Sequence, residues 1–290
     1  MVDLQYEAPG SLDAAVALLA NAEGEARVMA GGTDLVVQMR SDMIEPALVV
    51  DIKNIPEMGA ITHEADGGWR VGAAVTGMEL CDHAEFKAAW PGVIEGVALI
   101  GSIQIKGRAS MGGNLCNASP AADSVPPLIA SGATVHIIGP NGERDAAVED
   151  IATGPGQTSL EKGELVVWFK FPPRPAHSGD AYQRFTPRTE MDIAVVGVGV
   201  DLTLDDAGIC SAARVVLGAV AAKMLVVAEC ADALVGTPVD DAALENLAKA
   251  ASAACRPIDD KRGTKEFRIK VAGVLARRVA QQALARARQN

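Results

Sequence analysis

Aromatic residues are scarce in this 290-residue sequence, at 3%, and no apolar run is long enough to cross a bilayer. The nearest candidate, Val215 to Val227, is interrupted by Lys223. The five cysteines are an odd number and include no CxxC or CxxxxC pair, which argues against a cysteine-based metal or cluster site. The first ten residues contain neither a basic start nor an apolar run, so we expect a soluble, cytoplasmic protein with free thiols.

Basic residues are in the minority, with 26 against 37 acidic residues and a net charge of −11 at pH 7. This balance disfavours nucleic acid as a partner, because phosphate binding needs a positive surface. The last thirty residues reverse the balance, with nine basic residues and one acidic residue. They fit either the solvated face of a C-terminal helix or a docking surface for an acidic partner.

The remaining composition is that of a folded chain, with 49% apolar and 22% charged residues, and its length suits two domains. A proline-rich, polar stretch that begins at Pro172 predicts a domain boundary near residue 176. Beyond it, three strands are expected at 181–185, 193–204 and 209–219, followed by three largely helical segments. The pattern indicates an α+β fold without internal repeats.

The N-terminal half of the sequence predicts alternating helices and strands, with glycine pairs in the connections. A helix capped by Ser11 is predicted up to Ala20, a strand at 27–29, a helix at 35–40 and a strand at 47–52. Residues 101–119 read as a long glycine-rich loop that we expect a bound ligand to order.

Gly31–Gly32 and Gly112–Gly113 are the candidate binding motifs. Two adjacent glycines let successive backbone amides turn inward and form a nest for an anion such as a pyrophosphate, without the lysine of a P-loop. Ser110 adds a hydroxyl group to the second motif, and the Asp123 carboxylate can accept hydrogen bonds from ribose hydroxyls. Each pair taken alone also fits a tight turn. We reject a dinucleotide-binding fingerprint at Gly197-Val198-Gly199, because Leu202 holds its third glycine position.

Two sequence segments closely resemble the FAD-binding medium subunit of the molybdenum hydroxylases: AGGTDL at 30–35 and QIKGRASMGGNLCNASPAADSVPPL at 104–128. That family includes bacterial carbon monoxide dehydrogenase and the FAD domain of xanthine dehydrogenase. The resemblance spans essentially the whole chain, including EFRIK at 266–270. It implies a two-part FAD-binding domain of the PCMH, vanillyl-alcohol-oxidase-like type at 1–175, with subdomains of about 1–55 and 56–175. A smaller α+β domain with a three-stranded antiparallel sheet and helices follows at 176–290.

The resemblance also implies which residues contact FAD. The two glycine segments match those that wrap the FAD pyrophosphate, Asp123 matches the ribose-binding acid, and Arg184 stands where a relative has lysine. Ile100, Gly101 and Val166 match positions near the cofactor. The implied set is Met29, Ala30, Gly31, Gly32, Thr33, Asp34, Leu35, Val36, Ile100, Gly101, Ser110, Met111, Gly112, Gly113, Asn114, Asp123, Val166 and Arg184.

The implied function is electron transfer in a heteromeric molybdenum hydroxylase. A large subunit with the molybdenum-pterin cofactor would oxidise substrate, a small subunit with [2Fe-2S] clusters would pass electrons on, and FAD in this chain would deliver them to an external acceptor. A dimer of heterotrimers is the expected assembly. Thr33–Asp34 replaces the His-Ser of many carbon monoxide dehydrogenases, so carbon monoxide is not the first substrate we expect. A self-sufficient flavin oxidase and a flavin-free scaffold subunit of the same fold are the alternatives.

No catalytic set or metal cluster is readable in this chain. The histidines lie outside the two glycine segments, so we expect FAD to bind noncovalently. Cys116, four residues after Gly112, fits a small buried filler better than a thioether to the flavin.

Overall fold

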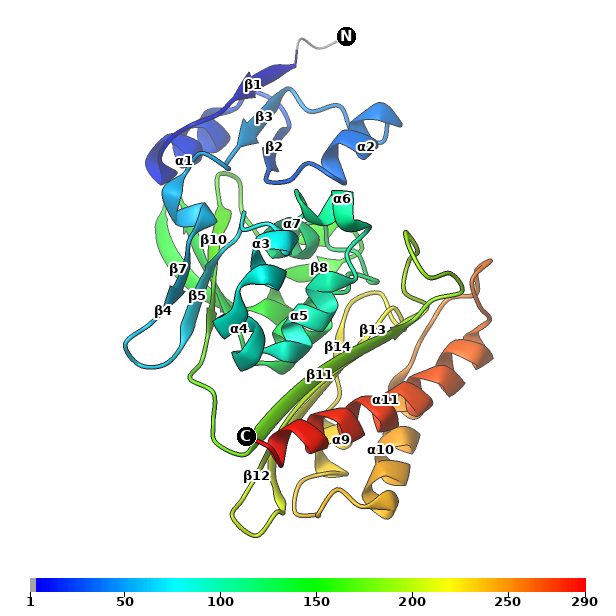
Figure 1. Cartoon of the computed structure of the whole chain (residues 1–290). Coiled ribbons are helices and arrows are strands. Elements are labelled where there is room, and N and C mark those ends of the chain that lie inside the picture. Colours follow the sequence, from blue (N-terminus) through cyan, green and yellow to red (C-terminus); the bar gives the residue numbers. More distant parts are fainter. Residues whose placement is uncertain (1–3) are drawn as a thin grey trace.

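The computed structural model describes residues 4–290, and its N-terminal unit is a small parallel sheet with two helices (Figure 1). The Ser11 hydroxyl accepts a hydrogen bond from the Ala14 amide at 3.3 Å, which confirms the predicted helix cap. The first helix buries Ala15, Val16 and Leu19. The elements are β1 (Gln5–Glu7), α1 (Leu12–Asn21), β2 (Ala26–Met29), α2 (Leu35–Arg40) and β3 (Leu48–Asp51), with strand order β1-β3-β2.

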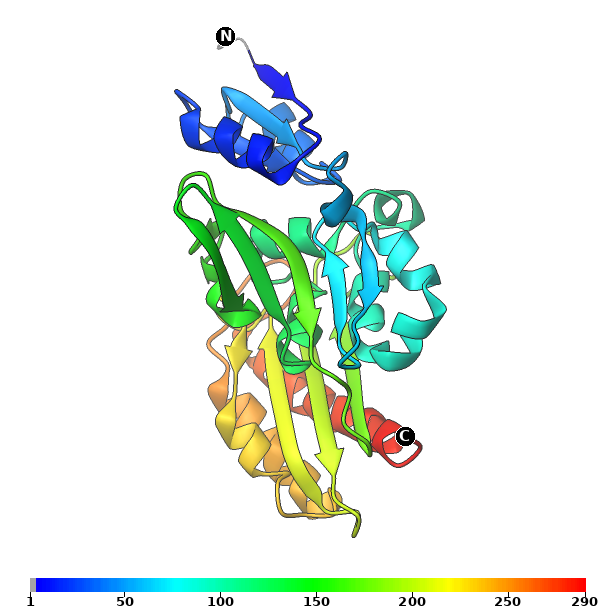
Figure 2. The same cartoon turned by 90° about the vertical axis from the view of Figure 1, so that its left-hand side faces the viewer.

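The second unit is built on an antiparallel sheet of five strands, which Figure 2 shows below the N-terminal unit. The sequence Asn141–Gly142, which is typical of a tight hairpin turn, connects β6 to β7, with Gly139 paired to Gly142. The strands are, in sheet order, β4 (Ile61–His63), β5 (Trp69–Gly72), β10 (Leu165–Phe171), β6 (Thr134–Gly139) and β7 (Gly142–Ala147). The short elements η1 (Pro56–Gly59), η2 (Val148–Asp150), β8 (Ala152–Gly154) and β9 (Gln157–Thr158) complete it.

Helices fill the chain between β5 and β6. The expected long loop at 101–119 is wrong in part, because Ser110 caps a short helix by accepting the Gly113 amide, so local hydrogen bonds help to order this segment. The helices are α3 (Gly77–Asp82), α4 (Ala84–Ala89), α5 (Pro91–Ala98), α6 (Ile103–Lys106), α7 (Met111–Cys116) and α8 (Val125–Ala130).

The C-terminal unit packs helices on one face of an antiparallel sheet, and α5 and α8 cover the other face (Figure 1). The three predicted strands are present, and a fourth strand of two residues adds to them. The sheet packs tightly against α8 at Gly199, where a Cβ would lie 2.8 Å from the Pro126 carbonyl carbon. The elements are β11 (Ser178–Phe185), β12 (Val196–Leu204), β13 (Cys210–Gly218), β14 (Leu225–Val226), α9 (Ala228–Asp232), α10 (Asp241–Ala254) and α11 (Lys265–Ala287).

The side chains form two hydrophobic cores. Residues from Ala15 to Phe171, joined by Val216, build the first core, and residues from Ala181 to Ala287 build the second. The chain passes from one core to the other in the connection between β10 and β11. Among residues 4–290, no helix is long and apolar enough to span a membrane.

The basic C-terminal segment is used largely for pairing with acidic residues of the same chain. Arg268 is almost fully buried and donates to Asp260 at 2.8 Å, while Arg286 reaches Glu95 on α5 at 2.5 Å. Arg262 and Arg277 pair with Asp192 and Asp241. The charge reversal seen in the sequence is therefore compensated in part inside the fold.

A polar cluster joins the second unit to the C-terminal unit. The buried Asp180 carboxylate accepts the Gly92 and Val93 amides at the start of α5, at 2.8 and 3.2 Å. Arg174 lies 3.0 Å from Asp180 and 3.7 Å from Asp201, so one guanidinium faces two carboxylates. Burial raises the pKa of Asp201 to about 7, with the Asp180 charge adding to the shift and Arg174 opposing it.

We predict that Asp201→Asn flattens the pH dependence of the free energy of unfolding between about pH 4 and 7. The folded chain holds the Asp201 proton more tightly than the unfolded chain, so this contribution to stability is present at low pH and lost as the pH rises. The slope removed is at most about 1.4 kcal/mol per pH unit. Urea unfolding at several pH values measures it, with Asp206→Asn on the exposed turn as control. Equal slopes in wild type and Asp201→Asn would contradict the prediction.

Candidate functional site

A pocket lies where the N-terminal sheet meets the second unit, and residues of α2 and α7 line it. In Figure 1, α2 lies above and α7 lies below the boundary between the two units. Both glycine pairs contribute to its wall, although they are about eighty residues apart in sequence. The predicted residues in the wall are Met29, Ala30, Gly31, Gly32, Thr33, Asp34, Leu35, Ile100, Ser110, Gly112, Gly113, Asn114 and Val166.

The first loop connects β2 to α2 and presents unbonded amides. Gly32 has a φ of +73°, a conformation that favours glycine, and its carbonyl accepts the Val36 amide at 3.0 Å to start the helix. Within the described chain, the amides of Gly31, Gly32 and Thr33 have no hydrogen-bond acceptor. Amide donors in a pocket wall suit an anionic group, so the predicted nest fits this loop.

The second loop uses its amides internally, and there the predicted nest is wrong. The Gly112 amide donates to the Ala73 carbonyl at 3.2 Å, and the Gly113 amide donates to the Ser110 hydroxyl oxygen at 3.1 Å. Glycine is needed at 112 for a different reason, since a Cβ there would lie 2.5 Å from the Ala73 oxygen. The motif therefore brings α7 against the end of β5, and Ser110 keeps its hydroxyl hydrogen available to the pocket.

The two loops touch each other directly. A Cβ on Gly31 would lie 1.9 Å from the Arg108 carbonyl oxygen, so only glycine allows this approach. Gln38 on α2 also donates to the Asn117 side chain at 2.9 Å. These contacts fix the distance between the two sides of the pocket.

The structure places five of the predicted residues outside the pocket wall. Val36 points to solvent, with 43% exposure, and Met111 is buried in the first core. Gly101 follows Ile100 and has a φ of +61°. The other two, Asp123 and Arg184, pair with each other.

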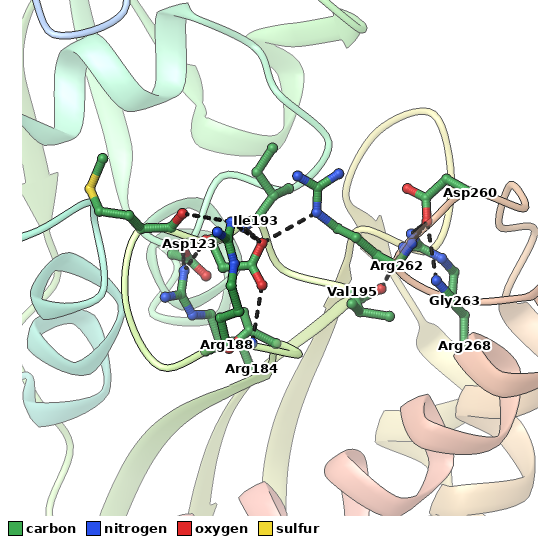
Figure 3. Close-up of polar contacts among 12 residues, drawn as sticks. Asp123, Arg184, Arg188, Ile193, Val195, Asp260, Arg262, Gly263 and Arg268 are labelled. Carbon is green, nitrogen blue, oxygen red and sulfur yellow. Dashed lines mark hydrogen bonds and ion pairs between the residues drawn. The ribbon is translucent and has the colours of Figure 1, made fainter.

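Asp123 and Arg184 form a buried ion pair between the second unit and the C-terminal unit (Figure 3). Their closest atoms are 2.5 Å apart, and the Tyr182 hydroxyl donates to the other Asp123 oxygen at 2.8 Å. Burial raises the pKa of Asp123 to about 6 despite both partners, which lower it. Burial also raises the pKa of Tyr182, which keeps its hydroxyl a donor. Arg184 reaches further to the Asp192 carbonyl at 3.2 Å, in the loop before β12.

Two carboxylates and one thiol stand in the pocket wall. Desolvation raises the pKa of Asp34, whereas the Arg144 guanidinium, bonded at 2.7 Å, holds the pKa of Glu164 below its usual value. Burial raises the pKa of Cys116 to about 12, so its thiol stays protonated. No group of three or more His, Cys, Asp or Glu side chains in residues 4–290 could hold a metal ion.

Sequence reasoning missed several wall residues, including Gln38, Ala73, Asn117, Leu160 and Glu164. Gln38 lies on the predicted helix one turn after Asp34, so helical spacing could have found it. Ala73 and Asn117 are brought in by the packing of α7, for which the local sequence gives no signal.

Comparison with known proteins identifies the family. Residues 2–174 match the family described as the FAD binding domain in molybdopterin dehydrogenase, and residues 181–283 match the CO dehydrogenase flavoprotein C-terminal domain. The putative xanthine dehydrogenase FAD-binding subunit of Escherichia coli is 31% identical over 97% of this chain and 96% of its own length. The carbon monoxide dehydrogenase medium chain of Afipia carboxidovorans is 34% identical over 98% and 97%.

Solved structures of relatives superpose on nearly the whole chain. A reconstituted CO dehydrogenase from Oligotropha carboxidovorans superposes with a TM-score of 0.93 at 34% identity, and 98% of each chain is covered. Quinoline 2-oxidoreductase from Pseudomonas putida gives 0.89 at 29% identity with the same coverage. The chain therefore belongs to the FAD-binding medium subunits of the molybdenum hydroxylases, and it is an oxidoreductase subunit with an FAD-binding domain.

We predict that Gly113→Val removes FAD binding without unfolding the chain. A Cβ at this exposed helical position meets only the Ser110 hydroxyl, at 3.4 Å, so the added side chain extends into the pocket. FAD content should fall at least about tenfold, since a filled pocket excludes its ligand. Flavin absorbance per protein and the thermal midpoint of the flavin-free chain measure both effects. Gly59→Val, at an exposed glycine with open space around it, is the control. Normal FAD content in Gly113→Val would refute the assignment of this pocket.

We also predict that Asp123→Ala destabilises the fold by about 3–5 kcal/mol, because it leaves the Arg184 charge buried without a partner. The double variant Asp123→Leu with Arg184→Met removes both charges and should recover most of that loss. Urea unfolding of the single and double variants gives the comparison. Equal instability of both would show that the ion pair itself is not the cause.

Proposed function

We propose that this chain is the FAD-carrying electron-transfer subunit of a heteromeric molybdenum hydroxylase. In this proposal, electrons pass from [2Fe-2S] clusters of a small partner subunit through FAD to an external acceptor. A large partner subunit carries the molybdenum-pterin cofactor and oxidises the substrate. The observation that carries the proposal is the pocket itself, which two glycine loops from separate units form in a chain of this family.

The pocket residues fit a dinucleotide. The unbonded amides of Gly31, Gly32 and Thr33 suit a diphosphate, and the Ser110 hydroxyl can donate beside them. Apolar side chains such as Leu35, Ile100 and Val166 suit the flat rings of the cofactor. Asp123, Arg184 and Gly101 lie beyond the pocket wall, and we propose them as contacts for the remainder of the cofactor.

Bound FAD supplies the redox chemistry that this chain's side chains lack. The protein's part is to bind and orient the cofactor. The wall contains no paired acid and base: Glu164 is held ionised by Arg144, and Cys116 is held protonated by burial. This set of side chains supports a carrier of electrons rather than a self-sufficient oxidase.

We further propose that FAD is held noncovalently. His63 stacks on Trp69 and His136 stacks on Trp168, and no histidine of the described chain lies in the pocket wall. Cys116 does line the pocket, but its protonated thiol is a poor nucleophile.

The remaining parts of the proposal concern assembly. We propose a dimer of heterotrimers in the cytoplasm, with domains at 1–175 and 176–290 and subdomains of about 1–55 and 56–175. The change of hydrophobic core between β10 and β11 supports this division.

The test is the visible absorption spectrum of the purified full chain, followed by acid release and identification of the bound compound. A flavin spectrum and released FAD are expected. A colourless chain that also fails to take up added FAD would favour the scaffold alternative. Oxidation of an organic substrate by the isolated chain would instead identify a self-sufficient oxidase.

A further inference from the structure

Two cationic side chains hold carbonyl oxygens of the first glycine loop. Lys53 Nζ donates to the Ala30 carbonyl at 3.0 Å, and Arg108 Nε donates to the Gly31 carbonyl at 3.1 Å. Lys53 and Arg108 are not part of the pocket wall, whereas Ala30 and Gly31, whose carbonyl oxygens they bind, do line the pocket. Lys53 and Arg108 therefore act on the loop rather than on a ligand.

The carbonyl and amide of a trans peptide point in opposite directions. Fixing the Ala30 carbonyl therefore fixes the direction of the Gly31 amide, and fixing the Gly31 carbonyl does the same for the Gly32 amide. We propose that Lys53 and Arg108 are positioning residues for the FAD diphosphate: they hold two loop carbonyls outward so that the next two amides face the phosphates. This inference rests on the function proposed above.

Lys53 is itself held in place. Its ammonium lies 2.6 Å from both oxygens of the buried Asp51 carboxylate, which also accepts the Tyr6 hydroxyl at 2.5 Å. Burial alone would raise the pKa of Asp51, but hydrogen bonds from Lys53 and Tyr6 outweigh it and keep the pKa below its usual value. Asp51 stays ionised, and the cation has one well-defined position behind the loop.

Arg108 is fixed by the contact between the loops. Its carbonyl oxygen occupies the space where a Gly31 side chain would stand, so its backbone cannot move away without separating the two sides of the pocket. The guanidinium of Arg108 also donates a hydrogen bond to the Gly31 carbonyl. Backbone and side chain of Arg108 together hold one peptide of the first loop.

The charge of the pocket explains why cations are needed to hold these carbonyls outward. Glu164 and Arg27 in the wall are each paired, with Arg144 and Glu25, so the Asp34 carboxylate sets the sign of the charge there. If the Ala30 and Gly31 carbonyls turned inward, they would add negative dipoles where a diphosphate must bind. Cations behind the loop oppose that rotation and also attract the anion through the backbone.

The test measures the affinity of the flavin-free full chain for FAD, ADP and adenosine. Arg108→Met removes the charge and the donor but keeps an unbranched side chain as far as the position of Nε, and Arg108→Lys restores a charge and a donor. Lys53→Met tests the second cation. We expect Arg108→Met and Lys53→Met to weaken FAD and ADP at least about tenfold and adenosine less than about twofold, because adenosine has no phosphate. Arg108→Lys should recover most of the loss.

The outcomes separate this inference from the proposed function. If the wild-type chain binds neither FAD nor ADP, the proposed function fails and the inference falls with it. If wild type binds both and the methionine variants bind ADP equally well, only the inference is overturned. Equal losses for ADP and adenosine would also overturn it, since they would show a general structural role. Thermal midpoints of the flavin-free variants identify any variant that fails to fold, and Arg108→Lys against Arg108→Met then decides between charge and folding.

Discussion

The contact between Gly31 and Arg108 is the constraint on which the pocket depends. The two residues are seventy-seven positions apart, and the backbone of one occupies the space that any side chain on the other would need. β2 and β3 hold the first loop from the N-terminal unit, while Ala73, at the end of β5, holds α7 and the second loop. The pocket wall therefore forms where the N-terminal unit meets the second unit, and its width is set by this backbone contact together with the Gln38–Asn117 hydrogen bond.

The C-terminal unit fixes the second unit through buried charges. Asp180 accepts the first amides of α5, and the other end of that helix leads to Ile100 in the pocket wall. The Asp123–Arg184 pair adds a second connection near the loop before β12. Buried ion pairs add little net stability but require a definite geometry. The interface thus orients the elements behind the pocket more than it stabilises the fold.

Much of the fold follows from local sequence chemistry, and so do the two glycine pairs and Ser110 in the pocket wall, whereas the other predicted wall residues came from the family resemblance. The Ser11 cap, the Asn141–Gly142 hairpin and the glycine loop after β2 are set by their own residues. The misassigned features depend on distant partners. The Gly112 amide was expected to bind an anion, but Ala73, nearly forty residues earlier, accepts it. The pairing of Arg184 with Asp123 was not predicted either, because Asp123 lies 61 positions earlier and only the tertiary fold brings the two side chains together.

The absence of a lysine from the glycine motifs also has a structural reason. A P-loop lysine reaches its phosphates directly, as a point charge within the site. Here the cations stand outside the wall and bond to carbonyl oxygens, so positive charge reaches the pocket through oriented peptides. Such dipoles are fixed by the fold before a ligand arrives, and binding costs little reorganisation. A chain of net charge −11 can therefore offer a site for an anion without a cationic surface. The same arrangement explains why the glycine motif indicates the ligand but gives no sign of Lys53. This lysine lies outside both glycine segments, is held by Asp51 and reaches the first segment through the Ala30 carbonyl.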